Sequence, residues 1–259
     1  MKIESIKKDG DEKMTFTLSD ASLAYANALR RTLISEVPVM AVDEVDFYEN
    51  NSVLFDEFIA SRLALIPLNT DLKHYVMPQD CKEPSCSKCS EIFSLDAEGP
   101  GTVYSKSLKP KNKDLKPVFD DIPIMKLDKG QRLRLEAKAV LGRAKDHGKF
   151  KACFATYNMP QHVELAPDSK TPGAYFDACD KHYALVKQKK ATADDLIRCE
   201  SCRESRVADA KQLVRVVSDK TRFDFKIESY GNLEVKEVFK KALEILEEKT
   251  EGFEKALKE

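Results

Sequence analysis

This sequence has almost no net charge and no long hydrophobic run. Its 43 basic and 44 acidic side chains leave a formal net charge of −1, so no bulk electrostatic attraction to DNA or to a membrane surface is expected. No apolar stretch approaches the roughly 20 residues that a membrane-spanning helix needs. The opening residues, MKIESIKKDGDEK, contain no apolar signal core. We therefore expect a soluble, cytoplasmic protein that makes no direct sequence-specific contact with DNA and no contact with a membrane.

Sequence motifs that are typical of catalytic sites are absent as well. The sequence has no phosphate-binding glycine loop and no acidic triad of the kind that holds the metal ions of a polymerase. Cys153 lies in the alternating segment FKACFATY, where a cysteine is more often a small buried side chain than a nucleophile. We expect no catalytic residue in this chain.

The composition is that of a folded protein. Hydrophobic residues make up 42% and charged residues 34% of the 259 residues, which is typical of globular proteins rather than disordered ones. Alternation over residues 14–18 predicts a half-buried strand. Apolar residues at helical spacing then predict a helix from Leu23 to about Glu36, with Ser19 or Asp20 as its N-cap. Strand-like and helical segments both recur, which favours an α+β fold.

Two more helices are expected. The first is the short segment DEFIASRLALI (56–66), which ends before a proline. The second is the clearest in the sequence and follows Gly231, with Asn232 as the expected N-cap. Its apolar stripe consists of Val235, Val238, Phe239, Ala242, Leu243 and Leu246, and Phe253 and Leu257 extend it. Two interpretations stay open, because the stripe can pack on its own domain or partly on another chain.

Adjacent arginines interrupt the apolar run NALRRTLISEVP (27–38). On a helix Arg30 and Arg31 lie about 100° apart. At least one therefore projects sideways when the neighbouring leucines face inward. The spacing alone leaves open whether this side is solvated or holds a partner.

Several segments, in order, resemble one family. The stretches NALRRTLISEVPVMAVDEV (27–45) and DEFIASRLALIPL (56–68), preceded by the strand MTFTLSD, resemble the α-like subunits of DNA-directed RNA polymerase. This family comprises bacterial α and its archaeal and eukaryotic counterparts, and the archaeal members are the most similar. GPGTVYSKSLKP fits the family's middle domain, and FDFKIESYGNLEVKEVFKKALEIL resembles its closing strand and long helix. In LGRAKDHGKFKACFATY, residues His147, Lys149 and Phe150 align with the family segment G-x-x-x-x-H-A-K-W/F, and Gly148 stands where alanine is usual.

The resemblance implies a domain organisation. A discontinuous dimerisation domain is expected over residues 1–46 and 211–259. A mostly-β middle domain is expected over 47–157, and a small ferredoxin-like insertion over 158–210. The implied fold class is α+β.

The resemblance also implies a non-catalytic assembly role. Family members pair with a smaller α-like partner, here archaeal subunit L, and the heterodimer then binds the small zinc-containing subunits and the large catalytic subunits. On this basis the core shared with L would include Leu23, Leu29, Leu33, Val238, Phe239 and Leu246. Arg30, Arg31 and Arg62 would contact carboxylates of a large subunit, since a guanidinium group suits fixed pairing.

Cysteines are odd in number and clustered at short spacing, which in a reducing compartment favours metal binding over disulfides. Cys81, Cys86 and Cys89 form a C-x4-C-x2-C pattern that supplies three thiols, whereas structural zinc takes four ligands. The resemblance implies a fourth cysteine, and Glu83 occupies its position. We therefore weigh a zinc site completed by a carboxylate against a polar loop.

A second cysteine group lies in the expected insertion. Cys179-x2-His182 and Cys199-x2-Cys202 form a Cys3His set with acceptable zinc spacing. The resemblance implies instead an iron–sulfur insertion, but Ser205 occupies the third position of its cysteine run, and serine is a poor substitute for thiolate. Iron–sulfur, zinc and no metal all stay open, and the incomplete ligand set favours no metal. An alternative function is a metal-binding protein whose cluster gates folding or assembly.

Overall fold

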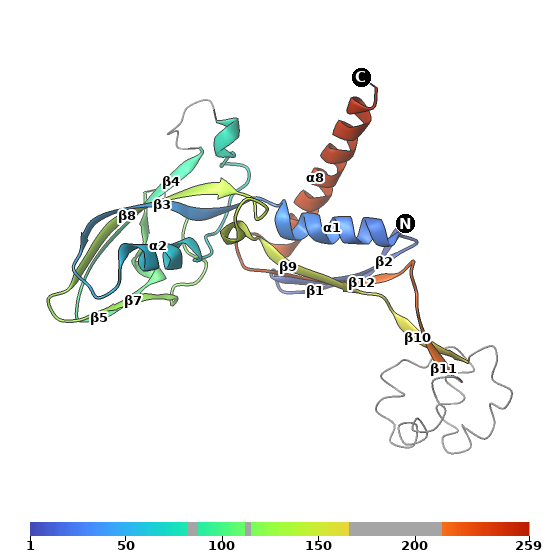
Figure 1. The fold of residues 1–259 in the computed structure, drawn as a ribbon, viewed down its shortest axis with the longest axis horizontal. Helices are drawn as coiled ribbons and strands as arrows, with labels where there is room; N and C mark the ends of the chain where they lie inside the picture. The colour runs from blue at the N-terminus through green and yellow to red at the C-terminus, as the bar shows by residue number, and fades with distance from the viewer. Residues whose placement is uncertain (82–87, 112–114, 166–213, 259) are drawn as a thin grey trace, which may run out of the picture. The chain divides into compact units, whose positions relative to one another are not determined.

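The computed structural model describes residues 1–81, 88–111, 115–165 and 214–258 (Figure 1). For residues 162–165 and 214–216 it describes the backbone only. The strands are β1 (Lys2–Asp9), β2 (Lys13–Ser19), β3 (Val39–Asn50), β4 (Ser90–Glu98), β5 (Gly101–Tyr104), β6 (Lys109–Pro110), β7 (Pro123–Leu127), β8 (Arg132–Gly142), β9 (Cys153–Asn158), β10 (Gln161–Leu165), β11 (Val214–Ser218) and β12 (Phe223–Ser229). The α-helices are α1 (Leu23–Ser35), α2 (Asp56–Ala64) and α8 (Val235–Ala256). The expectation of an α+β protein is confirmed.

Internal contacts divide the chain into two units. The first consists of Met1–Ile6, Phe16–Ala26 and Tyr157–Phe225, and the second of Lys7–Thr15, Asn27–Thr156 and Lys226–Glu259. The division passes through β1, β2, α1, β9 and β12. The described strands form four sheets, ordered β1-β2-β12-β9, β3-β8-β4-β6, β5-β7 and β10-β11.

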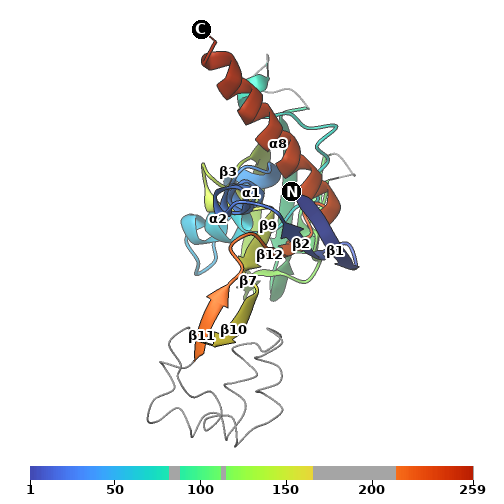
Figure 2. The same ribbon diagram turned by 90° about the vertical axis from the view of Figure 1, so that its right-hand side faces the viewer.

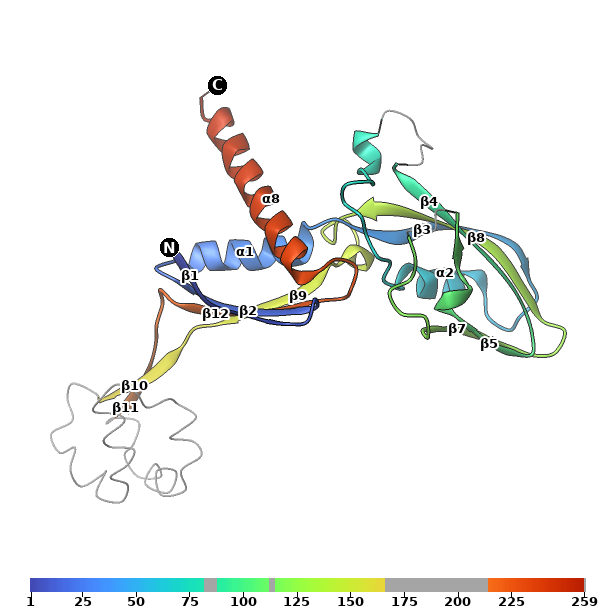
Figure 3. The same cartoon turned by 180° about the vertical axis from the view of Figure 1, so that it is seen from behind.

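The second unit contains a large core around the sheet of β3, β8 and β4. β3 and β8 are antiparallel from the pair Val39–Gly142 to the pair Asn50–Leu133 (Figure 3). Alternate residues of β8 are buried because side chains of a strand point to opposite faces in turn. Helix α2 buries Ile59 and Leu63 in the same core.

In the described part of the first unit, aromatic rings pack against each other. Phe16 of β2 and Phe225 of β12 are stacked, with ring centroids 5.0 Å apart. The Tyr157 ring meets Phe223 edge-on, with centroids 5.4 Å apart. β10 and β11 pair antiparallel and bring Leu165 beside Val214 (Figure 2).

Helix α1 begins where the sequence predicts, but its cap is different. Ser22 Oγ accepts a hydrogen bond of 3.2 Å from the Tyr25 backbone N–H, which is the usual N-cap geometry. The expected cap at Ser19 or Asp20 is wrong, because the helix begins at Leu23 and the capping side chain directly precedes it. Within the described residues, no helix is both long and apolar enough to cross a membrane.

The expected Asn232 cap of α8 is also wrong. The helix begins at Val235, and Glu234 precedes it without a capping side-chain bond. Asn232 Nδ2 instead donates to the Leu68 carbonyl at 3.2 Å. Its amide therefore anchors the loop before the helix to the segment after α2.

Candidate interaction surfaces

Helix α1 places its predicted interface leucines in different environments. Leu29 is 1% exposed and Leu33 is fully buried, although no other chain is present. Close packing of α1 on β9 explains this burial in part, because the Cys153 thiol donates to the Leu33 carbonyl at 3.3 Å. Leu23, at the start of the helix, is 50% exposed. Of these three leucines, only Leu23 presents a large apolar surface outward.

Helix α8 changes character along its length. The buried residues Val235, Val238, Ala242 and Ile245 all lie in its first half. Phe239 and Leu246 are half-buried. Phe253 is 66% exposed and Leu257, just after the helix, is 70% exposed. In Figures 1 and 3 the last turns of α8 run clear of β3, β4 and β8 of the same unit. The first half of the helix is therefore buried within the chain, and its far end exposes the apolar stripe.

Three arginines are predicted to contact a large subunit, and two of them already form hydrogen bonds within the chain. Arg30 Nη2 donates to Asn27 Oδ1 at 3.0 Å on the same helix. The Arg31 side chain is exposed. Arg62 is exposed and its Nη2 donates to the Pro123 carbonyl at 2.6 Å. Their contacts with a large subunit stay a prediction.

Most of the predicted metal ligands lie outside the described residues, namely Glu83, Cys86, Cys179, His182, Cys199 and Cys202. Cys89 is buried and its Sγ lies 2.8 Å from that of the half-buried Cys81, farther than the ~2.05 Å of a disulfide. Among the described residues, no group of three or more His, Cys, Asp or Glu side chains is placed to hold a metal ion. The metal predictions therefore stay predictions.

The segment Gly142–Phe150 has a clear structural role. The ring of the buried Phe150 lies against Gly142, where an added Cβ would be 2.6 Å from Phe150 Cε2. His147 Nδ1 accepts from the Lys149 N–H at 3.2 Å. Lys149 Nζ forms an ion pair with Asp43 Oδ1. The spacing of glycine, histidine, lysine and phenylalanine therefore folds this turn onto β3 and β8.

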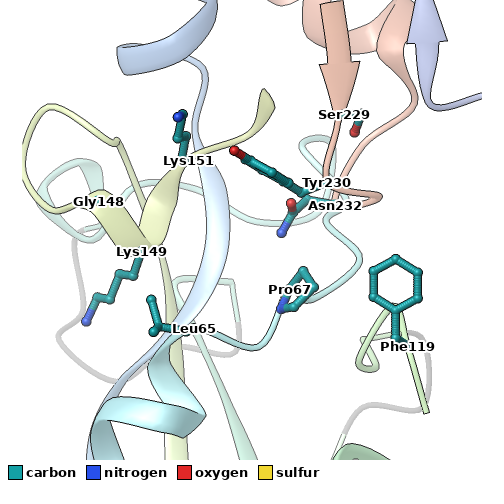
Figure 4. Close-up of a pocket in the computed structure, with 9 residues that line it drawn as sticks. All are labelled: Leu65, Pro67, Phe119, Gly148, Lys149, Lys151, Ser229, Tyr230 and Asn232. Atoms are coloured by element: carbon teal, nitrogen blue, oxygen red, sulfur yellow. The ribbon is translucent and has the colours of Figure 1, made fainter. Parts of the chain in front are cut away.

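A pocket of ≈ 370 Å³ in the second unit was not predicted from the sequence (Figure 4). Its walls are Leu65, Pro67, Phe119, Gly148, Lys149, Lys151, Ser229, Tyr230 and Asn232. These residues come from four stretches that are far apart in the sequence, so no spacing pattern signals them. Apolar and cationic side chains line it, and none of the lining residues is acidic.

Comparison with known proteins decides the family. Residues 45–155 match the family described as RNA polymerase Rpb3/RpoA insert domain. A protein of Pyrococcus horikoshii named DNA-directed RNA polymerase subunit Rpo3 is 40% identical over 263 residues, which cover 98% of this chain and 96% of that protein. The chain belongs to the Rpo3 family. Proteins of the same name from Archaeoglobus fulgidus and Methanothermobacter thermautotrophicus are 36% and 34% identical, covering 98% and 95% of this chain and 97% and 96% of theirs.

Membership of the Rpo3 family confirms the resemblance to the α-like subunits. Rpo3 is a non-catalytic subunit of DNA-directed RNA polymerase, and the catalytic subunits are others. Most of the pocket lies inside the insert-domain match, because Leu65, Phe119 and Lys151 fall within residues 45–155. Tyr230 and Asn232 come from outside this match.

Proposed function

We propose that this chain is an assembly subunit of RNA polymerase, which pairs with the smaller α-like subunit L and then binds the small zinc-containing and the large catalytic subunits. Membership of the Rpo3 family supports this role over the alternative of a free-standing metal-binding protein. The proposed place of action is the cytoplasm. The chain contributes binding surface rather than chemistry.

The exposed end of α8 is the observation that supports pairing with L. The helix is amphipathic, but the chain itself buries the apolar stripe only as far as Ile245. Phe253 and Leu257 are large apolar side chains that water surrounds in the isolated chain. Burying a side chain of this size stabilises a complex by roughly 1.5–3 kcal/mol. The end of α8 is therefore a strong anchor for a partner's apolar face.

Leu23 supplies a second exposed apolar contact at the start of α1. By contrast, Leu29, Leu33 and Val238 are buried by the chain's own residues. In the proposed heterodimer these three support the surface from beneath. The partner contacts the exposed or half-buried residues, which include Phe239 and Leu246.

The test is a binding titration of the full chain with subunit L of the same organism. The double substitution F253A/L257A removes exposed apolar surface only, and we expect it to weaken L binding by about tenfold or more. The matched control is E251A/K255A, which has the same spacing on the opposite face of α8 and also changes only exposed residues.

Both double variants should keep the thermal stability of the isolated chain. A wild-type chain that does not bind L contradicts the proposed function. If the wild type binds L and F253A/L257A binds equally well, the assignment of the α8 end as the interface is wrong.

A further inference from the structure

The pocket of Figure 4 combines an apolar rim with one available ammonium group. Phe119 and Tyr230 are both exposed large aromatic residues, and Leu65 beside them is exposed as well. Large apolar side chains gathered at a concave surface are typical of binding sites. None of these three residues belongs to the buried core, and they are 68%, 45% and 42% exposed for Leu65, Phe119 and Tyr230.

Lys151 lies near two aromatic rings and has no carboxylate partner in the described part of the chain. Its Nζ lies 5.6 Å from the centroid of the Phe154 ring and 5.9 Å from that of the Tyr230 ring. In Figure 4 the hydroxyl end of Tyr230 points toward Lys151. Two nearby aromatic rings favour this position of the ammonium group before a ligand arrives, which lowers the entropy cost of pairing.

The other lysine of the pocket already has a carboxylate partner within the chain. Lys149 forms an ion pair with Asp43, and in Figure 4 its side chain points away from Lys151. The pocket therefore offers a single positive charge and contains no acidic side chain. Charge complementarity selects a ligand with one carboxylate rather than a phosphate, which is usually bound by several donors.

Asn232 gives the pocket an acceptor that needs a donor. The residue is 5% exposed, and its Oδ1 accepts no hydrogen bond from any described residue, while Nδ2 donates to the Leu68 carbonyl. A buried acceptor without a donor is unfavourable. This acceptor is itself shielded from solvent, so it adds polarity to the pocket wall rather than a contact for a ligand.

Backbone hydrogen bonds hold the walls of the pocket together. The Tyr230 N–H donates to the Ala152 carbonyl at 3.2 Å, and the Thr70 N–H donates to the Asn232 carbonyl at 2.8 Å. Gly231, with φ +86°, lies close to Val118, where an added Cβ would be 2.5 Å from Val118 Cγ1. The pocket is thus formed by fixed segments and needs little rearrangement to bind a ligand.

We propose that this pocket binds an extended segment of another RNA polymerase subunit, in which an acidic side chain pairs with Lys151 and a neighbouring apolar side chain covers Phe119 and Tyr230. The inference rests on the proposed assembly function and names the chemistry of one partner segment. This site is separate from the exposed end of α8, because no residue of α8 lines the pocket.

The first experiment locates the bound segment. The substitution Phe119→p-benzoyl-phenylalanine places a photo-crosslinker at the rim, and the full chain is assembled with all its partners into polymerase before irradiation. Mass spectrometry should find a crosslink to one segment of another subunit that contains Asp or Glu next to an apolar residue. No crosslink, or a crosslink to a segment without an acidic residue, overturns the proposal.

The second experiment tests the charge. We expect K151E to weaken docking of the chain–L heterodimer onto the other subunits by about tenfold or more, and K151M to weaken it less. Reversing the identified acidic residue to Lys should restore docking of K151E. The control is K106E, because Lys106 also lies over an aromatic ring, 5.7 Å from the Tyr104 centroid, but does not line the pocket.

Binding to L is measured for every variant. A wild-type chain that fails to bind L refutes the proposed function. If K151E binds L and also docks like the wild type, only the pocket assignment is refuted.

Discussion

Lys249 Nζ lies 2.7 Å from Glu36 Oε1 and joins the middle of α8 to the residue that follows α1. Lys145 Nζ approaches the other oxygen of the same carboxylate at 3.4 Å. The Glu36 side chain is only 13% exposed, so one shielded carboxylate takes two ammonium groups. This triad fixes α8 just before its exposed end.

The triad predicts a pH-dependent contribution to stability. Burial alone would raise the pKa of the Glu36 carboxyl, but the hydrogen bonds and charges of Lys249 and Lys145 outweigh it and lower the pKa below its ordinary value of 4.5. A group whose pKa is lowered by folding stabilises the folded state above that ordinary value, and this stabilisation is lost as the pH falls through the lowered pKa. We expect E36Q to reduce the free energy of unfolding at pH 7 by about 0.5–1 kcal/mol.

Urea unfolding at several pH values measures this difference. It should shrink as the pH falls below 4.5 and should also shrink in high salt, because Lys249 is half exposed and its charge is screened. E248Q is the control, because Glu248 is exposed and forms no ion pair in the described residues. A difference that stays constant down to acidic pH would rule out the carboxylate as its source.

Local periodicity predicted the elements that bury an apolar face. Helix α1 and strand β2 follow the expected spacing, and so does α8. Strand β1 was not predicted, since all its residues are exposed and it has no buried face to produce an alternating pattern. It is a strand because it pairs with β2 in the sheet, and pairing through backbone hydrogen bonds produces no residue pattern in the sequence.

The interaction surfaces were predicted less well, for a related reason. A helical stripe indicates which residues are apolar but not which of them the chain itself covers. Leu29 and Leu23 look alike in the sequence and differ completely in exposure. Asn232 was expected to cap a helix, and its amide bonds a carbonyl 164 residues away instead. Such long-range partners are determined by the tertiary fold.

Gly142 should be intolerant of a side chain. In G142A the new Cβ would lie 2.6 Å from the Phe150 ring, and such overpacking typically costs about 1–3 kcal/mol. G148A is the matched control in the same segment, because nothing lies within 4 Å of its added Cβ. We expect a lower urea midpoint for G142A and an unchanged or slightly higher one for G148A. If G142A and the wild type have the same urea midpoint, the Phe150 ring is free to move away from the added Cβ.

Cys153 should be chemically inert in the folded chain. Burial raises the pKa of its thiol to about 12, so on the order of one molecule in ten thousand carries the reactive thiolate at pH 8. Iodoacetamide labelling followed by peptide mass spectrometry should leave Cys153 unmodified in the native chain and modify it in guanidinium chloride. Rapid labelling of the native chain would contradict both its burial and its hydrogen bond to Leu33.

Substitutions at Leu29 and Leu23 should have different effects, because the first should impair folding and the second should impair binding to L. L29D buries a charge in the chain's own core, because Leu29 is 1% exposed, and removing or misplacing such a core contact costs on the order of 3 kcal/mol or more. We expect L29D to unfold or aggregate even without a partner.

L23D changes a half-exposed position and should keep the circular dichroism spectrum and melting temperature of the wild type. In a titration with L, however, L23D should bind more weakly, because an aspartate would then face the partner's apolar surface. If L29D is as stable as the wild type, the burial of Leu29 within the chain is wrong. If L23D binds L with full affinity, the start of α1 lies outside the interface.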